Sequence, residues 1–296
     1  MKQPVFTGSC TALATPFTDS NAIDYPALHR LLDFQLENGT DAVVVCGTTG
    51  EASAMSYVER MRVIETVVRH VDGRIPVIAG TGSNNTESAI TLSRDAALAG
   101  VDALLVVTPF YNKATQKGLI RHYTAIADAA VKPVILYHVP SRTGMKCTAE
   151  TYAALAKHPN IVGVKEAGGD LALVQKTREL CPEDFCIWSG NDDETAPMML
   201  FGGKGVISVA ANIVPREMHE LTAACLNGDF TAAGRMQLKL RKLCEALFWE
   251  VNPIPVKTAL AMMGYCQESF RLPMCEMEPE NREKLKGVLK EYGLLP

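Results

Sequence analysis

Short apolar runs alternate with longer amphipathic stretches along most of the chain. The runs are rich in β-branched residues and are apolar at nearly every position. That pattern is typical of strands that are buried on both faces of a parallel sheet. Eight such strands are predicted, at residues 10–15, 42–46, 76–79, 103–107, 134–139, 161–164, 185–188 and 206–209.

The stretches between these runs repeat their apolar side chains with the period of an α-helix. In residues 24–38, for example, Leu28, Leu31 and Leu32 fall on one face, and Gly39 follows as a C-terminal stop. Helices are therefore predicted at residues 24–38, 58–71, 86–99, 115–130, 148–157, 171–180 and 194–201.

Eight strand–helix units favour a closed (β/α)8 barrel, the TIM barrel, as the fold class. An open doubly wound α/β sheet is the alternative, but it usually carries a Gly-x-Gly-x-x-Gly turn after its first strand, and the sequence has none there. The last third of the chain predicts helices without strands, one completing the barrel and the others forming a C-terminal helical extension. We expect the catalytic barrel at residues 1–225 and the extension at residues 226–296. These last helices are predicted at residues 215–228, 230–250, 255–264 and 279–292.

Composition narrows the class of protein. The 296 residues suit one α/β barrel, and 47% of them are hydrophobic. The net charge of -4 is spread along the chain without a basic tract, so nucleic acid is not an expected partner. No apolar run is long enough for a membrane span, and the N-terminus lacks the apolar core of a signal peptide. Nine scattered cysteines and six dispersed histidines indicate reduced thiols in the cytoplasm and no transition-metal site.

One lysine stands at the end of a predicted strand. Lys165 follows the run 161–164 and precedes Glu166 and the glycine pair 168–169. In an α/β barrel the chemistry gathers where the strands end. There a lysine stem lies among apolar side chains, and desolvation favours the neutral, nucleophilic amine. Lys165 is thus a candidate Schiff-base residue; the alternative is a lysine that extends from the strand end into solvent.

Two polar residues belong to the neighbouring strand end. Tyr137 ends the fifth strand, so we expect it beside Lys165, where a phenol can relay protons during imine formation. Arg142, in the loop that follows, offers a forked donor for a carboxylate. A buried tyrosine with a surface arginine is the alternative.

Glycine-rich and aromatic loops follow other strands. The turn at residues 47–51 offers the hydroxyls of Thr48 and Thr49 and backbone N–H groups for a carboxylate, unless it is an ordinary turn and helix cap. Phe110 and Tyr111 are adjacent and cannot both face one core; one of them contacts a neighbouring subunit, or both only pack the loop. The acids at residues 192–194 are predicted to start a helix. An amine, a phenol, hydroxyls and a guanidinium together suit a keto acid.

Six motifs occur in order along nearly the whole chain. Together they resemble the dihydrodipicolinate synthase family. They are Gly-Thr-Thr-Gly-Glu at 47–51, Val-Thr-Pro-Phe-Tyr-Asn at 107–112, Tyr-His-Val-Pro-Ser-Arg-Thr-Gly at 137–144, Val-Lys-Glu-Ala at 164–167, Gly-Val-Ile-Ser-Val at 205–209 and Asn-Pro-Ile-Pro-Val-Lys at 252–257.

The resemblance implies a lyase that condenses pyruvate with L-aspartate 4-semialdehyde, without metal or organic cofactor, in the diaminopimelate branch of lysine biosynthesis. It also implies a homotetramer built as a dimer of dimers. The residues it implies are Lys165 for the Schiff base; Tyr137, Thr48 and the partner subunit's Tyr111 for the proton relay; Thr49 for the pyruvate carboxylate; Arg142 for the semialdehyde carboxylate; and Gly190 and Ile207 as further binding residues.

Two alternatives remain at this stage. One is another pyruvate-dependent Schiff-base lyase, such as N-acetylneuraminate lyase or a 2-keto-3-deoxy-sugar-acid aldolase. The other is a non-catalytic barrel that binds keto acids.

The family resemblance fails at the positions where lysine-inhibited members bind lysine. Serine, alanine, two histidines, glutamate and tyrosine are replaced, and loss of the glutamate removes a partner for the ammonium group. We therefore predict weak or absent feedback by lysine. Asn84 is retained, and the replacements are Ala52, Ser53, Tyr57, Arg60, Ser88 and Phe110.

Overall fold

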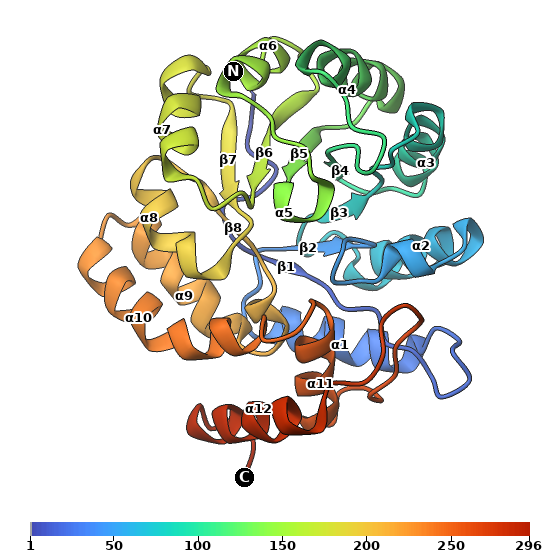
Figure 1. Ribbon diagram of the computed structural model, residues 1–296, viewed down its shortest axis with the longest axis vertical. Coiled ribbons are helices and arrows are strands. Elements are labelled where there is room, and N and C mark those ends of the chain that lie inside the picture. The colour runs from blue at the N-terminus through green and yellow to red at the C-terminus, as the bar shows by residue number, and fades with distance from the viewer. Residues whose placement is uncertain (1) are drawn as a thin grey trace.

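Eight buried segments pair side by side in chain order and close into a parallel barrel (Figure 1). The structure is a computed structural model and describes residues 2–296. The last strand pairs with the first, with Gly205 opposite Gly8. The predicted (β/α)8 barrel is confirmed. Its strands are β1 (Gly8–Ala12), β2 (Ala42–Val45), β3 (Val77–Gly80), β4 (Ala103–Val107), β5 (Val134–His138), β6 (Ile161–Glu166), β7 (Cys186–Ser189) and β8 (Gly205–Ser208).

Helices follow the strands and surround the barrel, and polar caps fix where several of them begin. Ser56 caps one of them by accepting a hydrogen bond from the N–H of Glu59, whose carboxylate accepts one from the N–H of Ser56 in return. One short helix was not predicted. It is α5 (Pro140–Thr143), which lies at the mouth of the barrel. The surrounding layer contains α1 (Tyr25–Glu37), α2 (Tyr57–Val71), α3 (Thr86–Leu98), α4 (Gln116–Ala130), α6 (Ala149–Leu155), α7 (Leu171–Leu180), α8 (Thr195–Leu200) and α9 (Pro215–Leu226).

Side chains alternate between the two faces of each strand, and this alternation creates two cores. One core fills the barrel interior and includes Cys10, Ile78, Trp188 and Ile207. The other lies between the strands and the surrounding helices. Neighbouring residues of one strand therefore face different surroundings.

The chain ends in three helices with no strand between them, as predicted. They are α10 (Phe230–Ala246), α11 (Ile254–Met262) and α12 (Pro279–Glu291), drawn in orange and red below the barrel in Figure 1. Helix α10 was predicted to reach residue 250. It ends earlier because the chain turns there and carries Phe248 and Asn252 to the mouth of the barrel.

Two further observations concern the cysteines and the length of the helices. All nine cysteines are free thiols. Within residues 2–296, none of the helices has the length and apolar character that crossing a bilayer requires.

Candidate active site

The carboxyl ends of the strands surround a chamber of about 150 Å³, which suits a molecule of a few heavy atoms. Its wall includes residues from both the barrel and the C-terminal extension. Among the predicted site residues, those that line it are Thr48, Thr49, Tyr137, Arg142, Lys165 and Gly190.

Lys165 and Tyr137 face each other across neighbouring strands. They are direct partners in the ladder between β5 and β6, and both are buried, at 6% and 8% exposed. Lys165 Nζ lies 4.5 Å from the centroid of the Tyr137 ring. An amine held in a small chamber beside a phenol is placed to attack a carbonyl carbon, with a proton donor within reach.

Gly190, which follows β7, leaves the space that the lysine stem occupies. A Cβ atom at this position would lie 3.0 Å from Lys165 Cε and 2.5 Å from the Cβ of Ala167. The N–H of Gly190 donates to the carbonyl of Glu166 at 2.7 Å, which fixes the close approach. Glycine at this position is therefore required by the close approach of Ala167, and it also leaves room for the lysine stem.

A residue of the C-terminal extension connects the two predicted carboxylate-binding residues. Asn252 Nδ2 donates to Thr49 Oγ1 at 3.1 Å, and the carbonyl of Asn252 accepts from Arg142 Nη2 at 3.1 Å. Asn252 Oδ1 is buried and has no hydrogen-bond partner in residues 2–296. The sequence placed Asn252 within a motif but assigned it no role, and only the contact across the fold identifies it.

The turn that carries the two threonines is held from behind by a buried ion pair. Glu51 has a left-handed backbone, with φ of 50°, and its carboxylate pairs with Lys257 of α11. The side chains of Glu51 and Lys257 are 2% and 0% exposed. Lys257 Nζ also lies 4.2 Å from the ring centroid of Phe17. Burial lowers the pKa of Lys257, and the Glu51 carboxylate opposes this shift.

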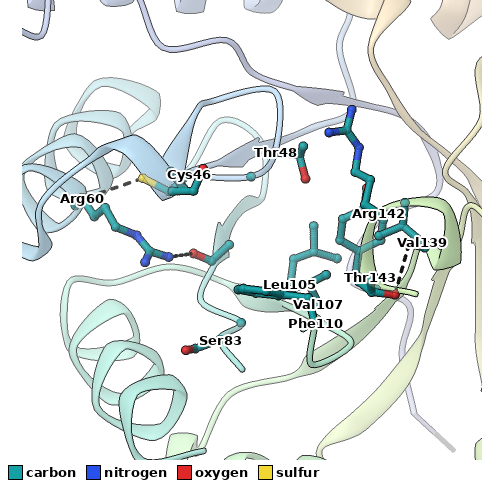
Figure 2. A pocket seen from close by; sticks show the side chains of 16 residues that line it. Cys46, Thr48, Arg60, Ser83, Leu105, Val107, Phe110, Val139, Arg142 and Thr143 are labelled. Atoms are coloured by element: carbon teal, nitrogen blue, oxygen red, sulfur yellow. Dashed lines mark hydrogen bonds between the residues drawn. The ribbon is translucent and has the colours of Figure 1, made fainter. Parts of the chain in front are cut away.

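A second cavity, of about 270 Å³, adjoins the chamber and shares Thr48, Tyr137 and Arg142 with it (Figure 2). Arg60 projects into the region where this cavity lies and donates from Nη2 to the carbonyl of Gly80 at 2.9 Å. Within residues 2–296, no aspartate or glutamate lines this cavity. Its electrostatic character is therefore cationic.

The acids after β7 lead into α8 as predicted, but one of them has a second role. They do form a 3₁₀ turn before α8, but the Asp192 carboxylate faces inward. It accepts hydrogen bonds from the N–H groups of Val209 and Ala210, at 3.1 and 2.9 Å. Burial raises the pKa of Asp192, and these hydrogen bonds oppose the shift. Asp192 thus ties the end of β7 to the end of β8.

Comparison with known proteins identifies the family of this chain. The model of the dihydrodipicolinate synthetase family matches residues 5–292. The chain belongs to this family. A 4-hydroxy-tetrahydrodipicolinate synthase of Thermoanaerobacter sp. (strain X514) is 52% identical, over 99% of this chain and 98% of that protein. One of Geobacter sulfurreducens is 52% identical, over 98% and 100%. The crystal structure of dihydrodipicolinate synthase from Aquifex aeolicus superposes with a TM-score of 0.96 at 47% identity, covering 98% of this chain and 99% of that one.

As a member of the dihydrodipicolinate synthetase family, the protein is an aldolase-type lyase of lysine biosynthesis, as predicted. Two residues implied by the family resemblance lie outside the chamber wall. Tyr111 is 91% exposed, in the loop between β4 and α4, with a φ of 68°. Ile207 is fully buried in the barrel interior, and Val209 lines the chamber near it.

Proposed function

We propose that this protein condenses pyruvate with L-aspartate 4-semialdehyde through a Schiff base on Lys165, giving 4-hydroxy-tetrahydrodipicolinate. Membership of the dihydrodipicolinate synthetase family and the full-length similarity to synthases of that name support the reaction. The observation that carries the mechanism is the buried Lys165 amine, 4.5 Å from the Tyr137 ring centroid in a chamber sized for a small keto acid.

The reaction begins when the neutral amine of Lys165 attacks the keto carbon of pyruvate. Loss of water gives an iminium ion, which withdraws electrons from the adjacent methyl group. The methyl group loses a proton, and the resulting enamine carbon attacks the aldehyde carbon. The amino group of the semialdehyde then displaces Lys165 from the imine carbon and closes the ring. One water is released overall, and the amine is regenerated.

Hydroxyl groups move the protons in these steps. Tyr137 and Thr48 stand on the wall shared by the two cavities. The partner subunit's Tyr111 completes the relay, and the high exposure of Tyr111 in the single chain supports this role. A phenol supplied by a second copy would make dimerisation a condition for full activity.

The two carboxylates of the substrates need separate partners. Thr49, held by Asn252, binds the carboxylate of pyruvate. Arg142 presents a guanidinium at the junction of both cavities and binds the carboxylate of the semialdehyde. Gly190 leaves room for the lysine stem, and Ile207 packs in the barrel interior. No metal or organic cofactor takes part.

The assembly is a cytoplasmic homotetramer, and each chain comprises a catalytic barrel and a helical extension that meet near residue 225.

Reductive trapping tests this proposal. Borohydride added with pyruvate should leave a stable adduct on the peptide that contains Lys165, and the Lys165→Arg variant should remain unlabelled. Condensation with aspartate semialdehyde should be faster than cleavage of N-acetylneuraminate or a 2-keto-3-deoxy-sugar acid. An unmodified Lys165 would indicate a non-catalytic barrel, and faster cleavage of a sugar acid would indicate a different lyase.

A further inference from the structure

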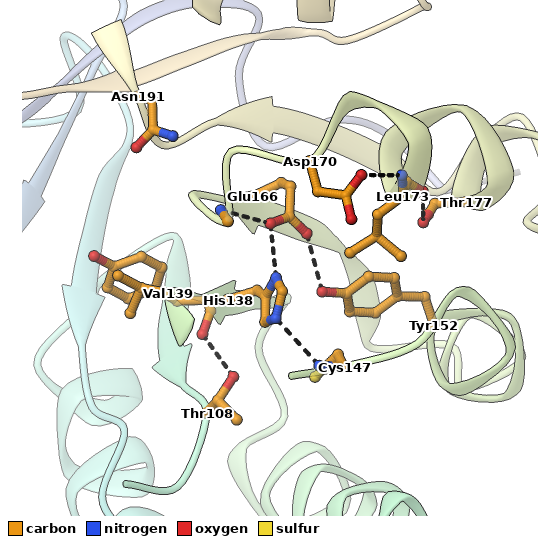
Figure 3. Close-up of polar contacts among 12 residues, drawn as sticks. Thr108, His138, Val139, Cys147, Tyr152, Glu166, Asp170, Leu173, Thr177 and Asn191 are labelled. Carbon is orange, nitrogen blue, oxygen red and sulfur yellow. Dashed lines mark hydrogen bonds and ion pairs between the residues drawn. The ribbon is translucent and has the colours of Figure 1, made fainter. Parts of the chain in front are cut away.

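Directly behind the wall of the chamber, His138 and Glu166 form a buried pair (Figure 3). His138 Nδ1 lies 2.7 Å from Glu166 Oε1, and the two side chains are 3% and 2% exposed. Glu166 Oε1 also accepts from the N–H of Gly168 at 2.8 Å. Glu166 Oε2 accepts from the hydroxyl of Tyr152, on α6, at 3.1 Å. The carboxylate therefore has three donors around it.

The hydrogen bonds define which atoms carry protons. The N–H of Cys147 donates to His138 Nε2 at 3.1 Å, so Nε2 holds the lone pair and Nδ1 holds the proton. His138 is thus a neutral donor to Glu166. Tyr152 is also a donor, because burial and then the Glu166 charge raise its pKa well above the ordinary value. The three hydrogen bonds compensate the Glu166 carboxylate for the water that it loses on burial.

This pair lies next to the catalytic residues on the same ladder. Tyr137 pairs with Lys165, and His138 pairs with Glu166, at the last two positions of β5 and β6. Because side chains alternate, the first pair faces the chamber and the second faces the helices. The His138–Glu166 contact therefore joins the two strands one residue beyond the amine and the phenol, where the sheet ends.

The backbone around Glu166 is adapted to this contact. A Cβ atom on Gly168 would lie 2.7 Å from Glu166 Oε1, so a larger residue there would have to displace the carboxylate from its hydrogen bonds. The carbonyl of Glu166 accepts from the N–H of Gly190, the residue that leaves room for Lys165 Cε. A displacement of Glu166 would therefore shift Lys165 in two ways. It would act along the backbone of β6, where the two residues are adjacent, and through Gly190, which is bonded to the Glu166 carbonyl.

We propose that Glu166, with His138, is a positioning residue that holds Lys165 at the correct distance from Tyr137 by locking the ends of β5 and β6. The inference rests on the proposed Schiff-base function. Neither side chain lines the chamber, so both act through the strand ends. Loss of the contact slows attack by the amine and leaves the groups that bind the substrate carboxylates in place.

The test measures how fast pyruvate is trapped by borohydride on full-length Glu166 variants. Glu166→Ala removes both acceptor oxygens and should slow trapping about 100-fold, the cost expected for a displacement near 1 Å. Glu166→Gln keeps an oxygen that can accept from His138 and Gly168, and it should restore the rate to within about threefold of wild type, because the geometry is kept. In steady-state assays of Glu166→Ala, kcat should fall more than KM for pyruvate rises.

A second histidine–carboxylate pair, which is partly exposed, provides a control at the opposite end of the barrel. His219 Nδ1 lies 2.9 Å from Asp41 Oδ2, which also accepts from the N–H of Ser9. Asp41→Ala should lower Tm but leave the trapping rate unchanged. If Glu166→Ala does not fold, Tyr152→Phe removes one donor only and should slow trapping about threefold.

The outcomes separate this inference from the proposed function. If wild-type protein forms no adduct, the Schiff-base function is wrong. If wild type forms the adduct and either Glu166→Ala or Tyr152→Phe traps it at the wild-type rate, the positioning role is wrong. Equal slowing by Asp41→Ala at a matched loss of Tm would also overturn it, because the effect would then reflect general destabilisation.

Discussion

Gly190 and Lys165 are so close that a single added carbon would bring them into conflict. The built Cβ of an alanine at position 190 lies 3.0 Å from Lys165 Cε and 2.5 Å from the Cβ of Ala167, so the lysine stem or the backbone has to shift. We expect Gly190→Ala to displace the amine and to lower kcat/KM for the condensation about 100-fold. Steady-state kinetics with both substrates would measure the loss.

Gly234 provides the control for that substitution. It lies within α10, and a Cβ atom there would meet nothing within 4 Å. Gly234→Ala should keep wild-type activity and gain up to about 1 kcal/mol of stability, because alanine is the better helix former. Full activity in Gly190→Ala would show that the lysine stem tolerates a shift of this size.

The pairing of Lys257 with Glu51 predicts a large effect on stability. Lys257→Met would leave the Glu51 carboxylate buried without its cation, and we expect a loss of about 3–5 kcal/mol in the free energy of unfolding. The double variant Lys257→Met with Glu51→Gln removes the stranded charge and should recover part of that loss. Urea unfolding checks both. Lys286→Met is the control, because the Lys286 side chain is 46% exposed. A Lys257→Met variant as stable as wild type would contradict the prediction.

The fold was predictable because most strands are apolar on both faces and the helices between them have an apolar face. Such patterns are local, so eight strands could be placed from the sequence. Six of the predicted site residues line the chamber because α/β barrels gather polar side chains at strand ends, which places Lys165 and Tyr137 on neighbouring strands. Polar residues at these ends, such as Thr48, are conspicuous after apolar runs.

What the sequence could not predict depends on contacts between distant segments. Asn252 reaches Thr49 from 203 positions away, and Lys257 reaches Glu51 from 206 positions away. Neither contact leaves a periodic pattern. The inward direction of Asp192 was also missed, because an acid before a helix has the same sequence signature whether it caps the helix or ties two strands together.

Glu59 and Arg271 predict a pH-dependent contribution to stability. Arg271 donates from Nη1 and Nη2 to the two Glu59 oxygens at 2.9 and 2.6 Å. The Arg271 hydrogen bonds, followed by that from the N–H of Ser56, lower the pKa of Glu59 from 4.5 to about 2. A depressed carboxyl pKa stabilises the folded state above the unfolded pKa, and this stability is lost as the pH falls from 4.5 towards about 2.

The matching variant is Glu59→Gln. Because the Glu59 side chain is 32% exposed, we expect a loss of only about 1 kcal/mol at neutral pH. Urea unfolding at a series of pH values should show the gap between variant and wild type narrowing below pH 4.5. Glu280→Gln, whose side chain is 82% exposed, should change stability far less. A gap that stays constant down to acid pH would exclude the ion pair as its source.

Arg60 predicts how the protein responds to lysine. Its side chain lines the second cavity together with Ala52, Ser53 and Phe110, and none of the described residues that line that cavity carries a carboxylate. The ammonium group of a lysine side chain would meet a guanidinium there and find no anionic partner, so binding is opposed by charge repulsion. We expect no half-inhibition below millimolar lysine in a steady-state assay. An equal concentration of sodium chloride controls for ionic strength. The Arg60→Glu variant, which replaces the cation by a carboxylate, should bind lysine more tightly than wild type. Strong inhibition of the wild-type protein by micromolar lysine would contradict the prediction, because it would show that other groups neutralise the guanidinium.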